Sequence, residues 1–226
     1  MPDVVKGSAP TGSTGSRRGY RSPVREEQVR TTRRRAIEAA ERLFVERGYA
    51  GTTVTAVANR AGISAETIYA SLQGKRGLLE GVIDAAIRGP DGVAIEQQAW
   101  LAEVGTLPTA HDRLAGWVAA SCRTLARTSP IHAVIRGAAD REQFAVALQD
   151  TLRRERVRQV TAIAAEFLAD ALRPSLTVPE AGRRYAALLS PELYHLSVEQ
   201  MGWSPADLQE WLTGILQVDL LIAGPS

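Results

Sequence analysis

Apolar residues recur at i, i+3 and i+4 along most of the chain, and no stretch alternates between apolar and polar positions as a half-buried β-strand would. The first such segment predicts a helix from Thr31 or Thr32 to about Arg47, ended by Gly48, because glycine suits the left-handed conformation after a helix. Its buried stripe consists of Ile37, Ala40, Leu43 and Phe44. The whole pattern predicts an all-α protein of about nine helices.

Two short helices joined by a glycine turn are predicted next. Thr52 or Thr53 is a suitable N-cap for the first of them. Its apolar face consists of Val54, Val57 and Ala58. Gly62 permits a tight turn, and Ser64 is a suitable N-cap for a second helix over residues 65–69. This order of elements predicts a helix-turn-helix.

The second short helix presents small and polar residues outward, while Ile68 faces the core. The outward residues are Ser64, Ala65, Glu66, Thr67 and Tyr69. A short helix that carries hydrogen-bonding side chains at its N-terminus suits the DNA major groove, where Glu66 could accept a hydrogen bond from cytosine N4. The alternative is a helical hairpin that only contributes to a core.

A fourth helix is predicted from Lys75 to about Arg88. Its apolar stripe consists of Leu78, Leu79, Val82, Ile83 and Ala86. Lys75 lies in its first turn, where the helix dipole attracts anions, so the pattern indicates a phosphate contact. Arg35, with Arg33 and Arg34, lies in the predicted first turn of the first helix, where the helix dipole disfavours cations. A nearby phosphate would offset this unfavourable interaction. A solvated charge run is the alternative there.

Breaks in the pattern divide the chain. Residues 1–29 are rich in Gly, Ser, Pro, Thr and Arg and predict a disordered basic tail, which either lies along DNA or serves as a solubilising leader. The Gly89–Gly92 segment separates a DNA-binding domain, residues 30–88, from a rear domain, residues 89–226. Rear helices are predicted over about 93–103, 109–127, 130–139, 141–172, 178–201 (disturbed at Pro191) and 205–221.

The last two predicted helices are too apolar to be buried easily within one chain of this size. Pairing with a second copy would bury them in a four-helix interface, which predicts a homodimer. The residues expected at this interface are Leu193, Leu196, Trp211 and Ile215. The alternative is that the hairpin belongs to the intrachain core.

The charge distribution favours an anionic partner for the front of the chain. Residues 1–88 carry 15 Lys and Arg against 9 Asp and Glu, whereas residues 89–226 carry 12 against 16. A basic front and an acidic rear fit a protein that places one end on DNA.

Cys122 is the single cysteine, so no intrachain disulfide is possible. The chain also lacks an apolar run long enough for a membrane span. Both features predict a cytoplasmic protein.

No pattern of catalytic or metal-binding residues is visible, so neither an enzyme nor a cofactor is expected. The three histidines lie at no metal-ligand spacing from one another or from Cys122. A ligand pocket between the rear helices is the stronger expectation. Its candidate residues are Trp117, Ser121, His132, Arg136 and Tyr194. His132 and Arg136 are four positions apart and share a helix face, so an anionic or hydrogen-bonding effector is implied if both point inward.

The segment from about Arg33 to Ile83 resembles the DNA-binding domain of the TetR/AcrR family of transcriptional regulators. The residues that carry the resemblance are Ile37, Ala40, Leu43, Phe44, Gly48, Tyr49, Thr52, Thr53, Val57, Ala58, Ala61, Gly62, Ile63, Ser64, Thr67, Ile68, Tyr69, Lys75, Leu78 and Leu79. The sequence departs from the family at Ala56, Glu66 and Leu72, and Glu66 makes the base preference unpredictable by analogy.

The resemblance implies a homodimeric repressor that a small-molecule effector releases from a palindromic double-stranded operator. It also implies backbone contacts from Thr52, Thr53, Tyr69 and Lys75. Two other classes stay open: a helical small-molecule-binding protein or enzyme without a DNA role, and a non-specific DNA-binding protein, against which the nearly neutral net charge of +2 argues.

Overall fold

The computed structural model describes residues 23–90 and 92–222, and these residues form helices without any β-strand. Its only strand-like feature within those ranges is an isolated bridge between Leu172 and Leu221. The all-α prediction is therefore confirmed. No helix within the described ranges combines the length and apolar composition that a bilayer crossing requires.

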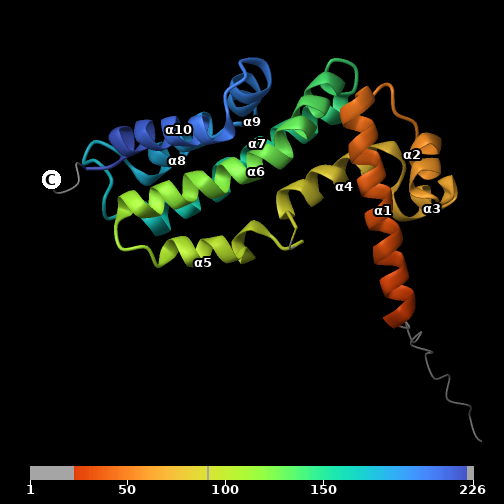
Figure 1. Ribbon diagram of the computed structural model, residues 1–226, viewed down its shortest axis with the longest axis horizontal. Coiled ribbons are helices and arrows are strands. Elements are labelled where there is room, and N and C mark those ends of the chain that lie inside the picture. Colours follow the sequence, from red (N-terminus) through yellow and green to blue (C-terminus); the bar gives the residue numbers. More distant parts are fainter. Residues whose placement is uncertain (1–22, 91, 223–226) are drawn as a thin grey trace, which may run out of the picture.

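The helices follow one another as two groups (Figure 1). The front group is α1 (Pro23–Arg47), α2 (Val54–Ala61), α3 (Ala65–Leu72) and α4 (Lys75–Arg88). The rear group is the 3-10 turn η1 (Ile95–Gln97), α5 (Ala99–Gly105), α6 (Ala110–Ala139), α7 (Gln143–Leu168), α8 (Val178–Leu188), α9 (Pro191–Tyr194), the π-helical turn η2 (His195–Gln200) and α10 (Pro205–Leu220). In Figure 1, α6 and α7 run along the long dimension, with α10 on one side and α5 on the other.

The front core is larger than the predicted front domain. Phe44, Ile68 and Leu78 are fully buried in it, as the apolar stripes predict. The same cluster also takes in Ile131 and Ile135 from the far end of α6. Hydrophobic packing thus continues across the boundary predicted at residues 89–92, and the end of α6 is joined to the front helices.

The rear core lies between α6, α7, α8 and α10. Its centre is Trp117, whose ring stacks on that of Tyr185 with centroids 3.6 Å apart and an interplanar angle of 8°. Phe167 meets the same indole edge-on at 6.2 Å. Such aromatic contacts bury a large apolar area in one fixed geometry.

Three predicted helix boundaries are wrong. α1 begins at Pro23, so residues 23–29 of the predicted tail are helical and Arg33–Arg35 lie well inside the helix rather than in its first turn. Residues 1–22 of that tail lie outside the described residues. α6 is continuous through Pro130, where a new helix was predicted, because packing on both cores outweighs the lost backbone hydrogen bond.

Pro130 is accommodated by its surroundings. The preceding residue, Ser129, is 1% exposed and donates from Oγ to the carbonyl of Pro191 at 3.2 Å.

The third wrong boundary is at 93–103, where a helix was predicted and η1 and α5 are found instead. The predicted disturbance at Pro191 and the start of the last helix after Ser204 are confirmed.

Candidate nucleic-acid interface and ligand cavity

The helix-turn-helix is set by two side-chain caps and one glycine. Thr53 Oγ1 accepts a hydrogen bond from the Ala56 amide at 3.1 Å and begins α2. Gly62 then adopts φ 64°, and its amide donates to the last carbonyls of α2. Ser64 Oγ accepts from the Thr67 amide at 3.2 Å and begins α3. These are the caps that the sequence predicts, and they fix the angle between the two helices.

The outer face of α3 is polar and accessible. Ser64 and Glu66 are exposed, Ala65 and Thr67 are half-buried, and Tyr69 is 59% exposed. Hydrogen bonds from the backbone amide of Glu66 and from Ser64 lower the pKa of the Glu66 carboxyl, so it is a charged acceptor at neutral pH. The side chains predicted to read bases are thus together on one surface.

Thr52 is not part of that surface. Its side chain is 1% exposed, and its hydroxyl donates to the carbonyls of Leu43 at 3.0 Å and Gly48 at 2.9 Å. The predicted DNA contact from the Thr52 side chain is therefore wrong, because the hydroxyl ties the end of α1 to the turn before α2. Its neighbour Thr53 is exposed, and its DNA contact stays a prediction.

Lys75 begins α4 as predicted, next to the aromatic ring of Tyr49. Its Nζ lies 4.2 Å from the ring centroid, which is within the range of a cation–π contact. Burial lowers the pKa of Lys75, whereas the charge of Glu142 raises it. Tyr49 in turn contacts Phe144 of α7, with ring centroids 5.3 Å apart. The predicted phosphate-binding lysine thus lies where the front helices meet α7.

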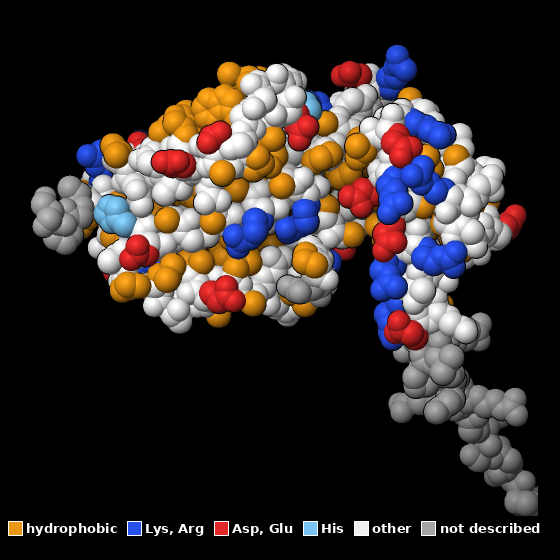
Figure 2. All heavy atoms as spheres, viewed as in Figure 1, with side chains coloured by type: hydrophobic (Ala, Val, Ile, Leu, Met, Phe, Trp, Pro, Cys, Tyr) orange, Lys and Arg blue, Asp and Glu red, His pale blue; other side chains and the backbone are white. Residues whose placement is uncertain are grey.

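Arginines of α1 reach the other helices of the motif. Arg33 Nη1 donates to the carbonyl of Ser71 at 2.9 Å, near the end of α3. Arg35 is exposed, and its Nη2 lies 2.9 Å from the position that a Cβ at Gly62 would occupy, so its guanidinium covers the turn of the motif. Lys and Arg side chains follow α1 along the surface in Figure 2. The sequence did not indicate the Arg33 contact, because it depends on the packing of α1 across α3.

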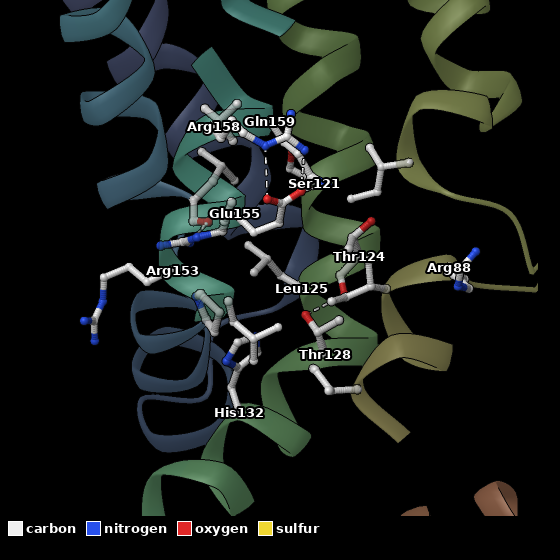
Figure 3. Close-up of a pocket in the computed structure, with 18 of the residues that line it drawn as sticks. Arg88, Ser121, Thr124, Leu125, Thr128, His132, Arg153, Glu155, Arg158 and Gln159 are labelled. Carbon is white, nitrogen blue, oxygen red and sulfur yellow. Dashed lines mark hydrogen bonds and ion pairs between the residues drawn. The ribbon is translucent and has the colours of Figure 1, made fainter. Parts of the chain in front are cut away.

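A cavity of about 600 Å³ lies between α4, α6, α7 and the α8–α9 corner. Figure 3 shows polar side chains from α6 and α7 facing it, among them Ser121, Thr124 and Thr128. Ser121 Oγ and the Tyr185 hydroxyl are 2.8 Å apart in a hydrogen bond at its inner wall. The volume is in the range of pockets for drug-sized ligands, which are mostly apolar with a few placed polar groups.

Three of the five predicted pocket residues line this cavity: Trp117, Ser121 and His132. Arg136 does not line it, because the cavity ends near His132 and the next turn of α6 packs into the front core. Tyr194 does not line it either; it is 3% exposed and packed in the rear core. The condition that both His132 and Arg136 point into one pocket is therefore not met.

The sequence prediction missed Arg156, which lines the cavity from α7. A signal was present: Arg156 lies four residues after Leu152 and four before Val160, so it interrupts an apolar helical stripe with a charge. Burial lowers the pKa of its guanidinium. Gln98 was missed as well, since it lies in a connection whose path depends on the fold.

Apolar side chains are exposed on η2 and α10, and a hydrophobic surface is visible over α10 in Figure 2. Leu196 and Trp211, two of the predicted interface residues, are 45% and 41% exposed, and Val218 is 72% exposed. The other two, Leu193 and Ile215, are half-buried. Trp203 packs edge-on against Trp211 with centroids 5.4 Å apart. If the last two helices only contributed to the intrachain core, their large apolar side chains would be buried, and these are not.

Residues 36–82 match the sequence model of the family described as bacterial regulatory proteins, tetR family. The chain is 37% identical over 68 residues to the HTH-type transcriptional regulator TtgR of Pseudomonas putida, covering 30% of this chain and 32% of that protein. It is 36% identical over 55 residues to the uncharacterized HTH-type transcriptional regulator YvkB of Bacillus subtilis, covering 24% and 29%. The matches thus span about a third of these relatives.

Solved structures extend the similarity beyond the helix-turn-helix. NalD, the secondary repressor of the MexAB-OprM multidrug efflux pump in Pseudomonas aeruginosa, superposes with a TM-score of 0.63 at 18% identity, covering 85% of this chain and 98% of that one. The SmeT–triclosan complex superposes with a TM-score of 0.64 at 19% identity, covering 85% and 93%. At these identities, the similarity establishes the fold of the rear helices together with that of the front helices.

Proposed function

We propose that this chain, whose residues 36–82 match the tetR family of bacterial regulatory proteins, is a member of that family and a sequence-specific, DNA-binding transcriptional regulator. The observation that carries the proposal is the outer face of α3, where Ser64, Glu66 and Thr67 surround the N-terminus of an exposed helix. Such a helix places hydrogen-bonding side chains against base edges in the major groove. The protein would meet its DNA in the cytoplasm.

Contacts to the DNA backbone would hold this helix in register. Thr53, Tyr69 and Arg35 are exposed around α3, and Lys75 begins α4 beside it. Phosphate contacts position a protein on the duplex without carrying sequence information, whereas contacts to bases specify the site. Glu66 is the side chain to which we assign the distinctive base preference, through its charged carboxylate.

We assign dimer formation to the exposed apolar face of η2 and α10, which includes Leu196, Trp211 and Val218. Two copies joined there by a two-fold axis would present two α3 helices to a palindromic operator, about 34–36 Å apart for successive half-sites. A single helix of eight residues offers few base contacts, so the dimer supplies the affinity and specificity that one copy lacks.

We assign the cavity to a small-molecule effector that releases the operator, so the protein would act as a repressor. Ile83, Ile87 and Arg88 of α4 line the cavity, while Lys75, to which we assign a phosphate contact, lies at the other end of α4. A ligand that moves α4 would therefore change the position of α3 in both copies. By thermodynamic linkage, DNA would weaken effector binding by the same factor.

Selection from a randomised duplex library at physiological salt tests the proposal. Enrichment of a palindrome is the expected outcome and would identify candidate target genes. Retention of all duplexes without enrichment would favour non-specific binding that falls steeply with salt. No retention by the folded protein would favour the alternative of a small-molecule-binding protein without a DNA role.

A further inference from the structure

Among the described residues, one arginine of the cavity wall forms no close ion pair with a carboxylate. Arg156 is half-buried on α7 between Leu152 and Val160, and all three side chains line the cavity. Its Nη1 donates to the carbonyl of Leu189 at 2.8 Å, which leaves the other N–H groups of the guanidinium for a further partner. Its side chain is half-buried, and burial is the main influence on its pKa, which it lowers.

The other arginines of the cavity wall are neutralised by carboxylates on their own helices. Arg88 pairs with Asp84 at 2.9 Å, Arg153 with Asp150 at 2.9 Å, and Arg158 with Glu155. Arg153 also extends away from the other side chains in Figure 3. Within the part of the chain that the structure describes, Arg156 forms no such pair.

Carboxylates of the cavity wall do not replace that missing partner. Glu80 pairs with Arg76, and Glu96 accepts a hydrogen bond from Gln159 at 3.3 Å. Glu192 is the carboxylate whose charge acts on Arg156, but it is solvent-exposed in the first turn of α9. A desolvated cation without a close counter-ion is unfavourable by itself and becomes favourable when an anion binds it.

The surroundings of Arg156 suit a ligand that is apolar apart from one charged group. Burial lowers the pKa of His132 to about 4, so this neighbour is neutral near pH 7 and does not compete for an anion. Thr128 and Ser121 contribute hydroxyl groups to the same cavity wall. The remaining wall is largely apolar and includes Leu125, Leu152, Val160, Ile163, Trp117 and Leu189.

We infer that the cavity takes an amphipathic organic anion, a carboxylate on an apolar body, and that Arg156 is the residue that binds its carboxylate. The planar guanidinium suits a carboxylate because two parallel hydrogen bonds can form between them. The inference rests on the proposed function only for the role of the ligand as an effector. Because the same guanidinium holds the Leu189 carbonyl, where α8 ends, the bound anion also acts on the α8–α9 corner.

Three matched probes test the inference by isothermal titration calorimetry on the full chain: 6-phenylhexanoate, 6-phenyl-1-hexanol and 6-phenylhexylamine. They share an apolar body and differ in the charge of one end. We expect the carboxylate to bind at least about tenfold more tightly than the alcohol, the gain typical of a charge-assisted hydrogen bond, and the amine most weakly. Preference for the amine, equal affinities, or no uptake of any probe would overturn the assignment.

Two variants locate the charged contact. Arg156→Gln should reduce the affinity for 6-phenylhexanoate to that for the alcohol, whereas Arg154→Gln, an equal charge change at an exposed position of α7 outside the cavity, should leave the preference intact. If Arg156→Gln does not fold, Arg156→Lys serves in its place and should lose part of the preference. An unchanged preference in either Arg156 variant would overturn the assignment.

The result is independent of the DNA experiment. Carboxylate binding without any palindrome in the library selection would leave the anion site standing and remove its regulatory role. An enriched palindrome together with equal affinities for the three probes would leave the regulator standing and remove the anion site.

Discussion

Arg127 of α6 donates a hydrogen bond from Nε to the carbonyl of Ala86, 3.1 Å away in the last turn of α4. The next carbonyls of that turn, those of Ile87 and Arg88, both accept from Gln98 Nε2 at 3.2 Å. Gln98 lines the cavity, so a side chain that a bound ligand could contact also holds the end of α4. The carbonyls at a helix C-terminus lack partners within the helix, so these bonds fix the position of α4.

Replacement of Arg127 by methionine should loosen this end of α4. The loss of one hydrogen bond, about 1 kcal/mol, predicts roughly fivefold faster amide exchange in the last turn of α4 and unchanged exchange in α2. Hydrogen exchange measured by mass spectrometry checks this. Arg123→Met, one turn earlier and exposed, is the control. Equal exchange in the two variants would show that Arg127 does not hold α4.

Substitutions in α3 and α4 should separate the proposed base reading from the proposed backbone contact. Glu66→Ala should change the preferred sequence in the library selection, because it removes the charged acceptor from the outer face of α3. Lys75→Ala should weaken all duplexes alike and reduce the salt slope by about 1. Glu103→Ala, exposed in α5 and outside the cavity, is the control. An unchanged preference in Glu66→Ala would contradict our assignment of base reading.

Thr52 should contribute to stability and not to DNA binding. Thr52→Val removes a buried hydroxyl that satisfies two carbonyls, so the free energy of unfolding should fall by about 1–3 kcal/mol. Thr52→Ser, which keeps the hydroxyl, should retain most of that stability. Urea unfolding followed by circular dichroism measures both variants. A selective loss of DNA affinity in folded Thr52→Val would restore Thr52 to the DNA surface.

A charge on the exposed face of α10 should separate the proposed dimer. Trp211→Glu places a carboxylate in an apolar surface that pairing would bury, and sedimentation equilibrium should then show monomers. Val146→Glu is a matched control, since Val146 is an exposed apolar residue of α7, 43% exposed. Dimers in both variants, or monomers of the unmodified chain, would place the interface elsewhere or remove it.

His132 should make the protein less stable in mild acid. Burial lowers its pKa to about 4 from an ordinary value of 6.5, with smaller effects from Glu192, which raises it, and from Arg156 and Arg136, which lower it. Between these values the unfolded chain binds a proton that the folded chain does not, so stability falls as the pH decreases from 6.5 to 4. The loss would be at most about 3 kcal/mol.

Unfolding measured across that pH range checks the His132 prediction. His132→Gln removes the titrating group and should lessen the slope between pH 6.5 and 4. The same slope in His132→Gln would show that other groups account for the acid sensitivity.

Local patterns in the sequence determined the helix-turn-helix almost completely. The caps at Thr53 and Ser64 and the turn at Gly62 depend on neighbouring residues alone, so they were predictable without knowing how the helices pack. The apolar stripes likewise identified the buried sides of α1 and α4, because a helix places residues three and four positions apart on one face.

Only the tertiary structure decided which side chains meet across helices. The sequence could not show that Thr52 is tied to Leu43, that Arg136 lies beyond the cavity while Arg156 lies inside it, or that α6 passes through Pro130 unbroken. Each of these depends on contacts between segments distant in the sequence or on the balance between packing and local preference. Helical periodicity shows which face of a helix is buried, whereas the packing of the whole chain determines which residues that face contacts.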